Sequence, residues 1–167
     1  MDFNLLVVLF AIAVTIHNIE EAVWLPRWSE SAGRWHHPVN AREFRFAVVV
    51  LTVLAYVVSF LAVLGGRGSI GAYLVAGYAL AMLLNVAFPH IAATMALRSY
   101  APGTATALLL NLPVTICLLR RAILEHYIAW SRFVWIGPLV VVVMLALIPF
   151  LFALGRRQWC MRPSDQA

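Results

Sequence analysis

Long apolar blocks constrain the fold of this chain more than any other feature. Five of them can be drawn, at about residues 3–25, 44–64, 70–97, 104–121 and 133–155. Each is long enough, or nearly so, to cross a hydrocarbon core about 30 Å thick. Lipid-facing segments must satisfy their own backbone hydrogen bonds, and none of these blocks alternates with the period of a barrel strand. The sequence therefore predicts an all-α fold, an integral membrane bundle of about five transmembrane helices.

The charged residues are few and lie mostly between the blocks. They make up 11% of the chain, whereas soluble domains carry about 25%. All 12 basic residues are arginine and do not line one face, a distribution that is typical of membrane-protein loops and does not favour a nucleic-acid partner. We expect one transmembrane domain over residues 1–160, in contact with membrane lipids, and a polar tail over residues 161–167.

The arginines also predict an orientation. Four of them lie in connections on the N-terminal side of the membrane, namely Arg67, Arg120, Arg121 and Arg132, and the other eight lie on the opposite side. Because positive charge accumulates in cytoplasmic loops, we expect a multi-pass protein of the inner (plasma) membrane with its N-terminus outside and its C-terminus in the cytoplasm.

The first block contains three ionisable residues in the segment His17-Asn18-Ile19-Glu20-Glu21. A charged side chain inside a span costs about 2.5–3.5 kcal/mol on insertion scales, so these groups need partners. At about 100° per residue, Glu21 lies roughly 40° to one side of His17 and Glu20 roughly 60° to the other. The three therefore share one face within a single turn, and Trp24 returns to that face.

The third block carries a matching feature in the segment from Asn85 to His90. Pro89 removes a backbone hydrogen bond, so a kink is expected there, with a freed carbonyl near Asn85 that lipid could not satisfy. Such a break belongs beside a polar cavity.

Counting residues from the span ends places several polar side chains at one depth. His17, His90 and Asn111 each lie eight or nine residues from the same membrane face, or about 12–14 Å. Thr52 in the second span reaches a similar level, and Glu20 and Glu21 are slightly shallower. We expect a buried polar layer that brings these side chains together.

Two kinds of chemistry fit this layer. In the first, His17, His90 and one or both of Glu20 and Glu21 bind zinc or non-haem iron, because two imidazoles and a carboxylate leave coordination positions open. In the second, no metal is present and a His–Glu pair acts as acid and base, with Trp24 stabilising a developing cation. In both, the candidate catalytic residues are His17, Glu20, Glu21 and His90, and the candidate substrate-binding residues are Trp24, Asn85, Asn111 and Thr52.

These features favour an integral membrane enzyme that acts on a lipophilic small molecule, such as a lipid or an isoprenoid-like compound. The metal-free chemistry would make it an isomerase or a cyclase. A non-catalytic lipid-binding subunit and a proton-coupled carrier are the remaining alternatives, because buried Glu and His can also bind ligands or relay protons. A homo-oligomer is compatible with all of them. His36 and His37, in the first connection, are interpreted as solvated loop residues.

The His17 to Glu21 segment resembles the signature of the HXXEE family of small bacterial integral membrane proteins. Further features in order strengthen the resemblance: Pro26 and Trp28, the Asn85 to His90 segment, and the turn Tyr100-Ala101-Pro102-Gly103 leading towards Pro113. It covers roughly residues 10 to 115. The resemblance implies a multi-span membrane protein, and because the family has no assigned activity it implies no mechanism.

Overall fold

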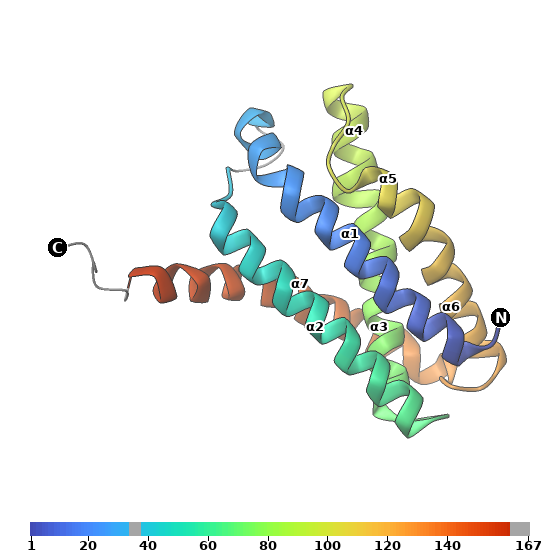
Figure 1. Ribbon diagram of the computed structural model, residues 1–167. Coiled ribbons are helices and arrows are strands. Elements are labelled where there is room, and N and C mark those ends of the chain that lie inside the picture. The colour runs from blue at the N-terminus through green and yellow to red at the C-terminus, as the bar shows by residue number, and fades with distance from the viewer. Residues whose placement is uncertain (34–37, 161–167) are drawn as a thin grey trace.

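The regular elements are helices, as predicted (Figure 1). The computed structural model describes residues 1–33 and 38–160, without the side chains of 158–160. In chain order the elements are α1 (Phe3–Ser31), α2 (Ala41–Gly65), α3 (Ile70–Asn85), η2 (Val86–Ile91), α4 (Ala92–Leu97), α5 (Thr104–Thr106), η3 (Ala107–Asn111), α6 (Leu112–Leu124) and α7 (Trp130–Cys160). His36 and His37 lie outside the described residues.

Five of the helical stretches in the described part are long and apolar enough to cross a membrane. They are Phe3–Ser31, Ala41–Gly65, Ile70–Leu97, Thr104–Leu124 and Trp130–Arg157. The protein is therefore a multi-pass membrane protein, in agreement with the five apolar blocks. The membrane that it occupies and its orientation there stay predictions.

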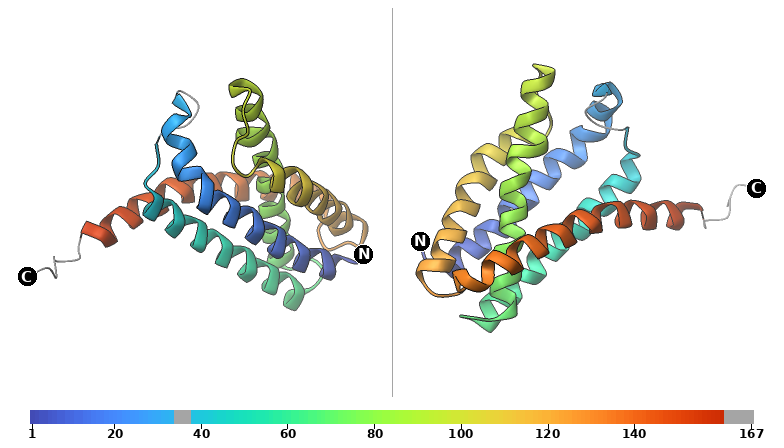
Figure 2. Two further views of the ribbon diagram at one scale, coloured as in Figure 1. Left: turned by 45° about the horizontal axis from the view of Figure 1, so that its top comes forward. Right: turned by 180° about the vertical axis from the view of Figure 1, so that it is seen from behind.

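Helix α3 lies at the centre of the bundle and packs against α2, α6 and α7 (Figure 2). Helices α1 and α2 run side by side, and α6 packs on the other flank of α1. Helix α7 crosses behind α2 and α3 in the view of Figure 1. Buried residues of α1 and α3, such as Phe10 and Val75, form much of the apolar core.

Small residues allow the close approach of α3 to its neighbours. A Cβ atom on Gly71 would lie 2.3 Å from the carbonyl carbon of Leu61 in α2, so α2 and α3 touch through their backbones there. On the other side, a Cβ on Gly77 would lie 2.6 Å from the Cβ of Val140 in α7. Both glycines are therefore needed for packing.

Helix α1 continues past Pro26, where the sequence suggested that the first connection begins. Proline has no N–H, so the carbonyl oxygen of Ala22, four residues earlier, lacks its helical donor. The Nε–H of Arg45 in α2 donates to this oxygen at 3.1 Å. This side chain satisfies the interrupted hydrogen bond, so the helix can extend to Ser31.

Replacement of Arg45 by glutamine should destabilise the protein by about 1–3 kcal/mol, because the Ala22 carbonyl would lose its donor. The variant Pro26→Ala restores a backbone N–H to that carbonyl. We therefore expect Arg45→Gln to cost much less in the Pro26→Ala background, as measured by a double-mutant cycle of unfolding in detergent. Equal costs in both backgrounds would contradict this role for Arg45.

The central helix breaks where the sequence predicts a kink. Phe88 has the extended dihedral angles φ −137° and ψ 123°, and the Phe88–Pro89 peptide bond is cis. The surrounding segment η2 and the segment η3 are both π-helical, a form that is frequent at functional sites. Each places one fully buried polar side chain, His90 and Asn111 respectively, in the interior of the bundle.

Candidate functional site

Three of the predicted residues converge in the interior, and we call His17, Glu21 and His90 the His/Glu cluster. The carboxylate oxygen Oε1 of Glu21 lies 3.3 Å from Nε2 of His90 and 3.7 Å from Nε2 of His17. One ligand atom from each residue lies within 4.8 Å of the other two. Both imidazoles are buried, and the Glu21 side chain is 15% exposed.

Local backbone geometry explains this convergence. His17 and Glu21 are four residues apart in α1, so they lie on one face of the helix. His90 comes from η2, where the break at Phe88 redirects the chain towards α1. The two imidazole rings meet edge to face, with centroids 4.9 Å apart and an interplanar angle of 88°. The predicted pairing of the first and third spans at this depth is therefore present in the structure.

Asn85, a predicted neighbour of the site, lies between the two imidazoles. Its Nδ2 is 3.0 Å from Nε2 of His90 and 3.4 Å from Nε2 of His17. An amide NH₂ group is a donor, so this contact fits Nε2 atoms that present lone pairs towards the cluster.

A second chain of hydrogen bonds defines the tautomer of His17. The hydroxyl of Thr106 donates to Oε2 of Glu20 at 2.6 Å, and Nδ1 of His17 lies 3.0 Å from the same hydroxyl oxygen. Because the single hydroxyl proton points to the carboxylate, the Thr106 oxygen accepts a hydrogen bond from the Nδ1–H of His17. Nε2 of His17 then carries the lone pair, as a metal ligand or a general base requires.

Glu20 itself lies outside the His/Glu cluster, although the helical wheel placed it on the same face. Its carboxylate accepts from the backbone N–H of Gly103 at 2.9 Å, from the backbone N–H of Thr106 at 3.4 Å, and from the hydroxyls of Thr106 and Tyr100. Partial burial raises the pKa of the Tyr100 phenol, and the hydrogen bond to Glu20 raises it further. Glu20 therefore holds the turn before α5 against α1, with Tyr100 as a stable donor.

Gly103 is the site residue that sequence reasoning treated merely as part of a turn. It has a φ of 89°, and a Cβ there would lie 2.5 Å from Cε1 of His90 and 3.0 Å from Cε1 of His17. The turn thus packs directly onto both imidazoles, and only glycine fits. A Pro-Gly pair signals a turn but does not reveal which side chains the turn will contact.

Three predicted substrate-binding residues have other surroundings. Thr52 accepts a hydrogen bond from Nδ2 of Asn18 at 2.7 Å and donates to the carbonyl of Val48, so it belongs to an α1–α2 contact. Asn111 is fully buried, and neither its Oδ1 nor its Nδ2 has a hydrogen-bond partner among the described residues. Trp24 is 60% exposed and lines an outer pocket beside Glu20.

A cavity of about 120 Å³ opens beside the His/Glu cluster, between α1, α2, α3 and α7. His17, Asn18, Glu21 and Asn85 provide its polar wall. The remaining wall is apolar apart from the phenol of Tyr78, and consists of Leu51, Tyr78, Ala81, Met82, Met144, Leu145 and Ile148. A largely apolar cavity with a few convergent polar groups is typical of a small-molecule site.

The fold and the site thus define a class, a multi-pass helical membrane protein with a buried His/Glu cluster on its first and third spans. Within this class, the family described as "Protein of unknown function with HXXEE motif" matches residues 8–118, and the chain belongs to it. The named motif comprises His17, Glu20 and Glu21. It therefore includes two of the cluster residues and the carboxylate that holds the turn before α5.

A relative is known by name but not by activity. The chain is 40% identical over 149 residues to "Uncharacterized protein YrkK" of Bacillus subtilis (strain 168). The aligned region covers 89% of this chain and 94% of the relative. No solved structure matches the chain. The function must therefore be inferred from the site.

Proposed function

We propose that the protein is an integral membrane metalloenzyme that acts on a lipophilic small molecule, with zinc or ferrous iron held by His17, Glu21 and His90. The observation that carries this proposal is the convergence of two imidazole nitrogens and one carboxylate oxygen in the interior. Glu20 is assigned a positioning role instead of the ligand role that the spacing suggested.

Electrostatics favours a cation at this position. Carboxylate oxygens and unprotonated imidazole nitrogens all present lone pairs, and at 3.3–3.7 Å these repel one another unless a proton or a cation lies between them. The amide of Asn85 contacts both nitrogens but makes no hydrogen bond to the Glu21 carboxylate. A divalent ion that took the place of the Asn85 amide at the two nitrogens would satisfy all three groups and leave that amide free for a ligand.

The spacing also suits a transition metal. Ligand atoms about 2.0–2.2 Å from a tetrahedral ion lie roughly 3.3–3.6 Å apart. The two distances from Glu21 to the imidazoles, 3.3 and 3.7 Å, need little adjustment to reach that range. Two imidazoles and one carboxylate leave at least one coordination position for water or substrate.

A bound ion of this kind would supply a Lewis acid or an activated water next to the apolar cavity. The chain's own residues would then orient the reactants. Asn85 can hydrogen-bond a polar atom of the substrate, and the apolar wall of the cavity excludes water from the rest of it. A substrate with a hydrocarbon body and one polar group matches this arrangement.

The metal content of the purified protein tests the proposal. We expect about one zinc or iron ion per wild-type chain by elemental analysis, and loss of the ion to background in His17→Ala, His90→Ala and Glu21→Gln, because each removes one of three ligands. His126→Asn is the matched control, since His126 lies outside the cluster and its positive φ of 59° suits asparagine.

Metal-free acid and base catalysis is the second candidate, and one distance favours it. The 3.3 Å separation of Glu21 Oε1 from His90 Nε2 also fits a shared proton. A folded wild type that contains no metal, and that takes up neither zinc nor ferrous iron under anaerobic conditions, would overturn the metal site. The same cluster would then favour an isomerase or a cyclase acting by proton transfer.

A further inference from the structure

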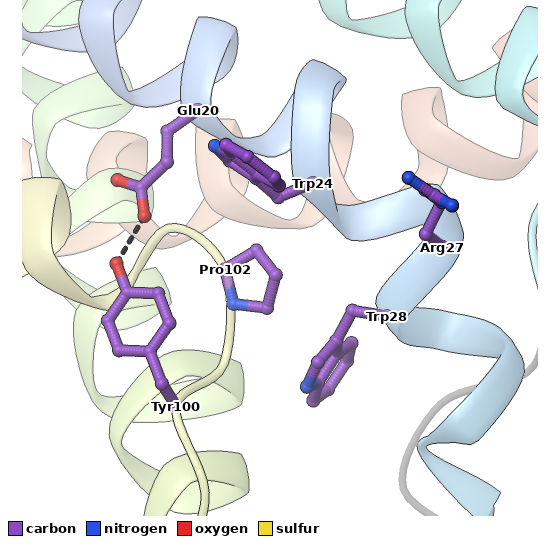
Figure 3. A pocket seen from close by; sticks show the side chains of 6 residues that line it. All are labelled: Glu20, Trp24, Arg27, Trp28, Tyr100 and Pro102. Carbon is purple, nitrogen blue, oxygen red and sulfur yellow. Dashed lines mark hydrogen bonds between the residues drawn. The ribbon is translucent and has the colours of Figure 1, made fainter.

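A second and larger pocket lies between α1 and the outer face of the turn that covers the imidazoles. It has a volume of about 700 Å³, and its lining residues are Glu20, Trp24, Arg27, Trp28, Tyr100 and Pro102. Figure 3 shows the two tryptophans of α1 facing Tyr100 and Pro102 of the turn, with Glu20 and Arg27 at opposite ends. None of the three cluster residues lines this pocket, so it is a separate site.

The pocket carries one charge of each sign. At its inner end, the Glu20 carboxylate already accepts from two backbone N–H groups and two hydroxyls, so it contributes negative charge but few free lone pairs. At its outer end, the exposed Arg27 guanidinium makes no ion pair with any described residue. A ligand that complements both ends carries an anion near Arg27 and a cation near Glu20.

The aromatic side chains between these charges favour the same ligand. Trp24 and Tyr100 are 60% and 53% exposed, so their faces are open to a ligand. Aromatic faces attract alkylammonium groups, and an adjacent carboxylate strengthens that attraction without any hydrogen bond. The planar fork of an arginine matches a phosphate. Tryptophan and tyrosine also collect at the headgroup level of a bilayer, where phosphates are abundant.

We propose that this pocket binds the zwitterionic headgroup of a phospholipid, with the phosphate on Arg27 and the ammonium group between Trp24, Tyr100 and Glu20. The site is independent of the His/Glu cluster and of its metal. The ammonium group lies beside the Glu20 carboxylate. The same carboxylate holds the turn over both imidazoles through its hydrogen bonds with Gly103 and Thr106.

Native mass spectrometry of the detergent-solubilised chain tests this proposal with dioleoyl phosphatidylethanolamine as the probe. We expect one lipid per wild-type chain and about tenfold weaker binding by Arg27→Gln, because a charge-assisted contact to phosphate is lost. Trp24→Leu should weaken this lipid but leave phosphatidylglycerol, which has no ammonium group, unaffected. Arg120→Gln, which changes an exposed arginine of α6, is the matched control and should bind like the wild type.

Several results would overturn the assignment. Equal binding by wild type and Arg27→Gln, with both proteins monodisperse, would contradict the proposed contact between Arg27 and the phosphate. If phosphatidylglycerol bound as tightly as phosphatidylethanolamine, the proposed contact with the ammonium group would be contradicted. Tight binding of water-soluble phosphoethanolamine would show that the pocket takes a free compound instead of a lipid. Metal content is unchanged in all of these outcomes, so they are separate from a failure of the metal site.

Discussion

Gly103→Ala should lower the free energy of unfolding by roughly 2–5 kcal/mol and abolish the metal binding that we propose for the His/Glu cluster. An alanine at a positive φ costs about 1–2 kcal/mol, and overpacking of a filled interior adds about 1–3 kcal/mol. The added Cβ would lie 2.5 Å from Cε1 of His90 and 3.0 Å from Cε1 of His17, so both rings must move. Unfolding in detergent and elemental analysis measure the two effects.

Gly68→Ala separates backbone strain from the clash. Gly68 has a φ of 72°, and a Cβ there would have no atom within 4 Å. This control should show the strain alone, about 1–2 kcal/mol, with the metal content of the wild type. If Gly103→Ala were no more destabilising than Gly68→Ala, the turn would not press on the imidazoles as the structure indicates.

The second large effect is expected for Glu20→Ala. This change leaves the N–H groups of Gly103 and Thr106 without their acceptor, and a lost charge-assisted hydrogen bond typically costs about 1.5–3 kcal/mol. Because two such N–H groups are affected, we expect a destabilisation of about 3–6 kcal/mol. The Thr106 hydroxyl would then be left with two acceptors, the Gly103 carbonyl at 3.2 Å and Nδ1 of His17, so the tautomer of His17 would be less strictly fixed.

Nitrogen NMR of the His17 ring provides a measurement that a purely structural role would not change. In the wild type Nδ1 should carry the proton, whereas in Glu20→Ala we expect a mixture of tautomers. Glu43→Ala is the control, since the pairing of Glu43 with Arg156 at 3.3 Å is a surface ion pair worth about 1 kcal/mol or less. An unchanged His17 spectrum in folded Glu20→Ala would contradict the proposed chain of hydrogen bonds.

Much of the fold was predictable because lipid imposes strict rules on the backbone. Apolar length was enough to place the five spans, and Pro89 was enough to place the break in the central helix. The end of α1 was not predictable in the same way. Pro26 normally ends or kinks a helix, and the compensating donor is the side chain of Arg45, which lies on a different helix.

The site was predictable in its depth but less so in its partners. Counting residues from the span ends correctly brought His17 and His90 together, because helices rise uniformly. The same reasoning treated Glu20 and Glu21 as equivalent, since a 100° rotation separates them and both flank His17. Their roles diverge because the turn containing Gly103 offers N–H donors on one flank of α1, and His90 approaches on the other. Non-local contacts of this kind leave no local sequence signal.

The position of α7 determines how the proposed substrate would be supplied. The cavity beside the cluster is closed on one side by Met144, Leu145 and Ile148 of this helix, and Leu145 is 63% exposed on the lipid-facing exterior. A hydrocarbon compound would therefore enter from the bilayer past α7. Its effective concentration would be its mole fraction among the lipids, so for the proposed enzyme the rate should fall when inert lipid is added, even though the amount of compound per volume of water is unchanged.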